Sequence, residues 1–265
     1  MNVSILGCGW LGFPLAKRLI ENGFSVNGST TSIAKLKVLE EENIVPFLIE
    51  LSEEKIIGTI SDFLSNADVL IIDIPPKLRG EQKENFVRKI QNLIPHIETS
   101  KIEKVLFVSS TSVYGEDEAI VTEETIPCPD TESGKQLAQV EKILKFNPNF
   151  KTTVLRFGGL IGADRHPIKF LAGKENLENP NAPVNLIHQK DCIALIEKII
   201  SMDCFAEVFN AVAPFHPTRK NYYTKKALEL HLEVPKFKEH SEKGKIIDST
   251  KIITLLNHSF ALDLY

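Results

Sequence analysis

Residues 2–12 read NVSILGCGWLG, and this stretch decides the expected fold. A short β-prone run leads into Gly7, Gly9 and Gly12, which have the spacing G-x-G-x-x-G, and a helical pattern follows without a break. In a dinucleotide site such glycines permit the strand-to-helix turn, the approach of a pyrophosphate to the backbone, and close packing of the helix on the strand. The N–H groups at the start of the helix attract phosphate. We therefore expect a nucleotide site here.

The chain up to residue 162 alternates strand-like runs with helical patterns. The runs within residues 68–74 and 104–109 are typical of parallel strands buried on both faces. This alternation predicts an α/β fold, a Rossmann-type doubly wound parallel sheet, over residues 1–162. Residues 163–265 have a looser pattern. We expect them to return to the sheet at about 184–212 and to form a small C-terminal substrate lobe.

The bulk composition is that of an ordinary globular protein, with 265 residues, 43% of them hydrophobic, and a net charge of −4. This charge offers no basic surface for nucleic acid or an anionic membrane. No apolar stretch approaches the roughly 20 residues of a membrane span. The cysteines, Cys8, Cys128, Cys192 and Cys204, form no C-x-x-C pair, which argues against a disulfide scaffold and fits a reducing cytoplasm. We expect buried thiols, no metal and a cytoplasmic protein.

The loop after the second expected strand bears on the choice of coenzyme. NAD-specific sites place a carboxylate about 20 residues past the glycines, where it binds the ribose 2′-hydroxyl. Here this position holds only hydroxyl side chains, Ser29, Thr30, Thr31 and Ser32, with Lys35 one helical turn further on. Such a loop accepts a 2′-phosphate that a carboxylate would repel, so we favour NADP over NAD. An ordinary helix cap with no coenzyme preference is the alternative.

Three further stretches complete a pattern that resembles the extended short-chain dehydrogenase/reductase superfamily, the NAD-dependent epimerase/dehydratases. They are SSTSVYG at residues 109–115, LRFGGLIG at 155–162 and NLIHQKD at 185–191. The resemblance spans about residues 1–212 and implies a nicotinamide coenzyme. Besides the glycines and the hydroxyl loop, the expected coenzyme contacts are Trp10, Leu11, Ile74, Pro75, Ser109, Lys135, Phe157 and Gly158. For Trp10, packing against a neighbouring loop is the alternative.

The catalytic residues implied by the resemblance are a Ser or Thr, a Tyr, and a Lys four residues after that Tyr. Ser110 matches the first and Lys135 the last, but the Tyr position falls on Thr131. An alcohol has no usable pKa and cannot replace a phenol as acid and base. The sequence therefore resembles an atypical member that keeps the cofactor site and lacks the standard acid.

Three functions remain open on this pattern. In the first, Tyr114, Tyr222, Tyr223 or Glu132 supplies the proton to a small polar, sugar-like substrate, although packing is the expected role of these tyrosines. In the second, the protein binds NADP(H) as a sensor or scaffold without turnover. In the third, the reaction is a non-redox isomerisation or elimination. We favour an NAD(P)-dependent oxidoreductase or epimerase-like enzyme.

Local patterns add four expectations. A helix is expected over residues 52–65, and another over 81–98 in which Pro95 kinks or ends the helix. Asp191 is expected to cap the helix that follows it.

Members of the superfamily often dimerise through helices that correspond here to residues 81–98 and 131–146. The resemblance therefore leaves a homodimer open.

Overall fold

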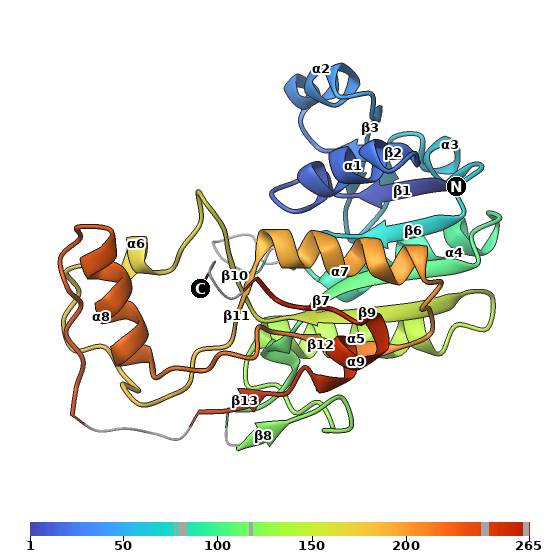
Figure 1. Cartoon of the computed structure of the whole chain (residues 1–265). Helices are drawn as coiled ribbons and strands as arrows, with labels where there is room; N and C mark the ends of the chain where they lie inside the picture. The colour runs from blue at the N-terminus through green and yellow to red at the C-terminus, as the bar shows by residue number, and fades with distance from the viewer. Residues whose placement is uncertain (77, 79–83, 117–118, 240–243, 262–264) are drawn as a thin grey trace.

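A seven-stranded parallel sheet organises the computed structural model, which describes all residues except 77, 79–83, 117–118, 240–243 and 262–264 (Figure 1). Its strand order is β12-β9-β7-β6-β1-β2-β3. The strands are β1 (Asn2–Leu6), β2 (Ser25–Thr30), β3 (Val45–Leu48), β6 (Val69–Ile72), β7 (Lys104–Ser110), β9 (Lys151–Phe157) and β12 (Val208–Ala211). The chain adds strands outward from β1 in one direction and then, from β6, in the other. The topological switch point therefore lies between β1 and β6, and the predicted Rossmann-type sheet is confirmed.

Helices cover both faces of this sheet. The helices around the sheet are α1 (Gly12–Glu21), α2 (Ile33–Glu41), α3 (Ile60–Leu64), α4 (Phe86–Glu98), α5 (Glu132–Lys145), α7 (Gln189–Ser201) and α9 (Thr250–Leu256). Alternate residues of β6 serve the two faces, because Leu70 packs in the core under α4 and α5 whereas Ile71 packs in the core under α1 and α7. Both side chains are fully buried, as expected of a central parallel strand.

The C-terminal lobe consists of residues 163–183 and 214–239, which carry α6 (Ile168–Leu171) and α8 (Arg219–Glu229) and lie to one side of the sheet in Figure 1. Bridges between its two parts hold it together, and it has its own buried cluster around Tyr222. Two short parallel strand pairs lie outside the main sheet, namely β10 (Gly159–Ile161) with β11 (Leu186–His188) and β8 (Ile120–Val121) with β13 (Ile246–Ile247). Between the two parts of the lobe, the chain passes back through α7 and β12 of the main sheet.

The expected helix over residues 52–65 is wrong for most of its length. A short hairpin occupies the first half, where β4 (Glu50–Leu51) pairs antiparallel with β5 (Ile56–Ile57), and α3 is confined to Ile60–Leu64. Gly58 explains the break, because its φ of +107° is not helical and a Cβ there would lie 2.1 Å from the carbonyl oxygen of Leu48.

Two further expectations are wrong, namely that α4 could end at Pro95 and that all four cysteines are buried. Pro95 lies inside α4, which continues to Glu98 instead of stopping, and the expected start of this helix at 81 lies outside the described residues. Cys128 is exposed and Cys204 is partly exposed, so only Cys8 and Cys192 are buried thiols. Both Cys128 and Cys204 lie in irregular segments outside the helices and strands.

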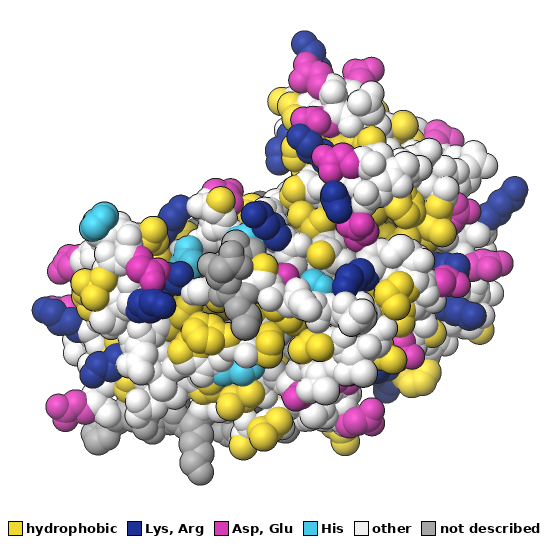
Figure 2. Space-filling view, in the orientation of Figure 1, with side chains coloured by type: hydrophobic (Ala, Val, Ile, Leu, Met, Phe, Trp, Pro, Cys, Tyr) yellow, Lys and Arg dark blue, Asp and Glu magenta, His cyan; other side chains and the backbone are white. Residues whose placement is uncertain are grey.

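The surface shows no concentration of one sign of charge on the face drawn in Figure 2, where acidic and basic side chains are intermixed. Within the described residues, no helix has both the length and the apolar character needed to cross a membrane. The charged groups most relevant to a ligand lie inside the pockets described next.

Candidate functional site

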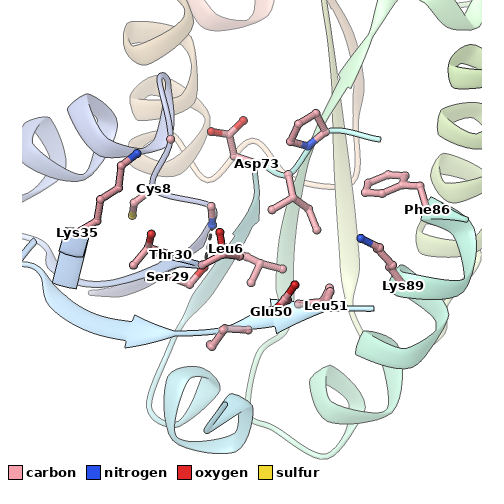
Figure 3. Close-up of a pocket in the computed structure, with 16 residues that line it drawn as sticks. Leu6, Cys8, Ser29, Thr30, Lys35, Glu50, Leu51, Asp73, Phe86 and Lys89 are labelled. Atoms are coloured by element: carbon pink, nitrogen blue, oxygen red, sulfur yellow. Dashed lines mark hydrogen bonds between the residues drawn. The ribbon is translucent and has the colours of Figure 1, made fainter. Parts of the chain in front are cut away.

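A pocket of about 220 Å³ opens at the switch point, where the carboxyl ends of β1, β2 and β6 meet (Figure 3). Ligands of doubly wound sheets bind at this kind of crevice. Eight of the predicted coenzyme contacts line it: Gly7, Gly9, Ser29, Thr30, Thr31, Lys35, Ile74 and Pro75. The apolar floor continues into Ile49, Leu51 and Phe86.

The three glycines of the first turn have different roles. A Cβ on Gly7, whose φ is +109°, would lie 2.4 Å from the carbonyl oxygen of Asp73, and a Cβ on Gly12 would lie 2.2 Å from that of Gly7. The protein's own packing therefore requires both. A Cβ on Gly9 would meet nothing within 4 Å. The open space above Gly9 borders the pocket and the start of α1, which is where a dinucleotide needs room for its pyrophosphate.

The hydroxyl loop is only partly free to contact a ligand. Ser29 is 2% exposed, and its Oγ accepts the N–H of Gly7 at 2.9 Å. The Thr30 hydroxyl accepts the N–H of Ser32 at 3.1 Å. Ser32 does not line the pocket. Thr31 and Lys35 are exposed and line the pocket, so within this loop these are the two side chains left free to contact a ligand.

Charged groups that sequence reasoning missed also line this pocket. Lys89 of α4 is buried, pairs with Glu84, and enters from the side opposite Lys35 in Figure 3. The carboxylate of Glu50 lies on the same wall as Leu51. Burial raises the pKa of the Asp73 carboxyl to about 8, against the opposing effect of the Gly12 N–H. The sequence held a signal for two of them: Lys89 interrupts the apolar face of a helix, and Asp73 directly follows a fully buried strand.

A second, polar cleft of about 310 Å³ lies beyond the carboxyl ends of β7 and β9, between the sheet and the lobe. It contains the predicted residues Ser110 and Gly158. The lobe contributes Arg219, and the segment leading to β13 contributes Lys245. The Nζ of Lys245 donates to Glu116 Oε1 at 2.8 Å. Arg219 has no ion pair within the described residues, so the cleft carries an unmatched positive charge.

The predicted residues of α5 lie away from both pockets. Thr131 is the N-cap of the helix, and its hydroxyl accepts the N–H of Gly134 at 3.1 Å. Lys135 is exposed and makes no ion pair or hydrogen bond through its side chain with any described residue. The structure therefore places Thr131 in a capping role, and it leaves the Lys135 side chain free to move.

Ser109, Tyr114 and Phe157 are buried and line neither pocket. The Ser109 hydroxyl donates to Glu141 Oε1 at 2.6 Å, and Arg156 donates to Glu141 Oε2, also at 2.6 Å. Arg156 also donates to the Tyr114 hydroxyl at 2.5 Å. This network crosses from the sheet to α5 and holds Tyr114 in the core, as its packing interpretation predicts.

Trp10, Leu11 and Gly12 complete the first turn. Trp10 Nε1 donates to Asp164 Oδ1 at 2.9 Å, and the indole ring stacks near Arg165, so Trp10 packs against the loop after β10. Leu11 is buried beneath α1. None of the three lines the first pocket. The tryptophan therefore ties the glycine turn to the start of the lobe.

The expectation that Asp191 caps its helix is wrong. His188 is the N-cap of α7, and its Nδ1 accepts the N–H of Lys190 at 3.1 Å. Asp191 lies in the first turn, is 4% exposed, and accepts the Tyr265 hydroxyl at 2.7 Å. A buried phenol thus holds the carboxylate inward, where it cannot reach the free N–H groups at the helix start.

Comparisons with known proteins agree with this geometry. Residues 2–125 match the model of the NAD-binding domain of 6-phosphogluconate dehydrogenase. Protein YeeZ of Escherichia coli (strain K12) is 35% identical over 262 residues, covering 98% of this chain and 95% of the relative. UDP-glucose 4-epimerase of Erwinia amylovora is 27% identical over 176 residues, covering 59% of this chain and 52% of that protein.

Solved structures share the fold over nearly the whole chain. The UDP-glucuronic acid 4-epimerase of Bacillus cereus, solved in complex with NAD, has a TM-score of 0.80 at 19% identity, covering 98% of this chain and 92% of that one. At this identity the likeness concerns the fold. The match to YeeZ extends over nearly the whole of both chains at 35% identity, which shows common family membership. The chain therefore belongs to the same family as protein YeeZ, and it has an NAD-binding domain of Rossmann type at its amino-terminal end.

Proposed function

We propose that this protein is an enzyme of the extended short-chain dehydrogenase/reductase type that uses NAD(P) to act on a small polar, sugar-derived substrate. The observation that carries the proposal is the space above Gly9 at the start of α1, since nothing in the protein's own packing requires a glycine there. The adenosine half of the coenzyme belongs in the first pocket. The substrate belongs in the second cleft, which follows along the same edge of the sheet.

The second cleft supports an anionic substrate. Arg219, Lys245 and Glu116 line it, which leaves a net formal charge of +1 among these three side chains. A diphosphate or carboxylate group would match this charge. UDP-sugars, named for both of the epimerases above, carry such a group and are the substrate class that we propose.

Binding and turnover test the proposal in two steps. Fluorescence titration with NADPH and NADH measures coenzyme binding directly. Coenzyme absorbance is then followed with aldehydes, ketones and nucleotide sugars, and chromatography of UDP-sugars detects epimerisation that leaves the coenzyme unchanged. Tight binding with no turnover across the panel would contradict an enzyme and favour a sensor. Absence of binding would contradict both.

Replacing Lys35 with alanine tests the preference for NADP. We expect NADPH affinity to fall about 5- to 10-fold, because one exposed charge-assisted hydrogen bond to the 2′-phosphate is lost, whereas NADH affinity stays within about 2-fold. Lys37→Ala is the matched control, because Lys37 lies on the same helix, is exposed, and does not line the pocket. Equal losses for both coenzymes, or equal affinities in the unaltered protein, would refute the preference.

A further inference from the structure

Helix α8 presents two functional side chains to the second cleft. Arg219 and Tyr223 are four residues apart, so they share one face of the helix, and both line the cleft with Ser110. Tyr223 comes from the lobe, whereas Ser110 ends strand β7 of the sheet. The same cleft is thus lined by a phenol from the lobe and a serine from the sheet.

The hydroxyl of Tyr223 differs from the other phenols of the chain. Tyr114, Tyr222 and Tyr265 each use the hydroxyl in a hydrogen bond, to Asn210, His166 and Asp191 respectively. Tyr223 makes no such bond with any described residue. Among these residues no fully buried side-chain oxygen lacks a partner, so the Tyr223 oxygen must be reached by solvent although the side chain is only 7% exposed. The cleft is the open space that this side chain borders.

We propose that Tyr223 is the catalytic acid and base of this enzyme, an inference that rests on the function proposed above. In the reducing direction, Tyr223 gives its proton to the substrate carbonyl oxygen. When bound, a reduced nicotinamide coenzyme would supply the hydride, with its two electrons, that the carbonyl carbon needs. The phenolate then recovers a proton from water in the cleft. In the oxidising direction, the same phenolate removes the proton from the substrate hydroxyl.

The charges around Tyr223 suit this role. Burial raises the pKa of the phenol, and the neighbouring Arg219 guanidinium opposes that effect. Lys245 and Glu116 are the other charged groups that line the cleft, and they bond to each other. Arg219 is therefore the cation available to stabilise the phenolate, as a general acid and base requires.

Phenylalanine replacements at adjacent positions test this assignment. Tyr223→Phe is expected to lower the rate of hydride transfer about 100-fold or more, because general acid–base catalysis contributes roughly 100- to 10,000-fold, while coenzyme affinity stays within about 2-fold. Tyr222→Phe is the matched control, since Tyr222 lies beside Tyr223 and its hydroxyl bonds to His166. The Tyr222→Phe variant should keep its turnover within about 3-fold of that of the unaltered protein. Turnover of Tyr223→Phe within about 3-fold of the unaltered protein would overturn the assignment.

A readout without turnover separates this inference from the proposed function. Labelling the four tyrosines with ¹³C at Cζ gives one NMR signal each, and Tyr223→Phe assigns its own. At an alkaline pH where all variants stay folded, Arg219→Gln should lower the ionised fraction of Tyr223 and leave the Tyr222 signal unchanged. An unchanged Tyr223 signal would overturn the inference. Failure to find any substrate for the unaltered protein would contradict the proposed function alone.

Discussion

Replacing Gly9 with valine is expected to weaken NADPH binding at least about 100-fold and to leave the folded protein almost as stable as before. The valine side chain would enter the space above the glycine turn, where a Cβ would meet nothing within 4 Å beyond Gly9 and its two chain neighbours. The pyrophosphate needs that space. A 100-fold loss corresponds to about 2.8 kcal/mol of binding free energy. Isothermal calorimetry gives the affinity, and thermal melting gives the stability.

Gly12→Ala is the matched control for this prediction, and the opposite result is expected. Its Cβ would lie 2.2 Å from the carbonyl oxygen of Gly7, so α1 could not pack on the turn without moving. We expect a loss of a few kcal/mol in the free energy of unfolding, typical of a steric clash in a close-packed core. If Gly9→Val destabilised the protein as much as Gly12→Ala, the space above Gly9 would serve folding rather than a ligand.

Asp73→Asn is expected to stabilise the protein above neutral pH. The pKa of Asp73 rises from its ordinary value of 3.8 to about 8 in the folded protein. Between these values the folded state keeps the proton and the unfolded chain has released it, so stability falls as the pH rises through this window. The loss approaches about 5 kcal/mol by pH 8, at about 1.4 kcal/mol per pH unit. Asparagine keeps the shape of the protonated acid and removes this loss.

Urea unfolding at several pH values between about 4 and 9 measures this effect. The unaltered protein should lose stability steadily across the range, and Asp73→Asn should lose much less. The control is Asp62→Asn, which removes an exposed carboxylate outside the first pocket. Parallel curves for Asp73→Asn and the unaltered protein would show that Asp73 is ionised at neutral pH in the folded state.

The glycine turn was predictable because its information is local. The spacing of Gly7, Gly9 and Gly12 after an apolar run specifies strand, turn and helix within a dozen residues. The role of Ser29 was not predictable in the same way. The sequence shows a hydroxyl at the tip of the second strand, but only the pairing of β1 with β2 turns it inward to the N–H of Gly7.

The missed site residues depend on contacts between distant segments. Lys89 reaches the first pocket because the first turn of α4 borders it, and Asp73 lies near the start of α1 because β6 is the neighbour of β1. Tyr223 is some 110 residues from Ser110 in the chain, and both line the second cleft only because the lobe forms part of its wall. Neither propensity nor periodicity carries such information.

The two-part origin of the lobe limits how the protein can be divided. A fragment ending at residue 162 would keep α1 but lack α7, α9 and β12, and so would expose to water the part of one sheet face that α7 and α9 cover. The lobe is thus built from two segments inserted into the chain on either side of α7 and β12. Because residues 184–213 would stay in place, exchanging the lobe for that of another family member would require four junctions, near residues 163, 183, 214 and 239.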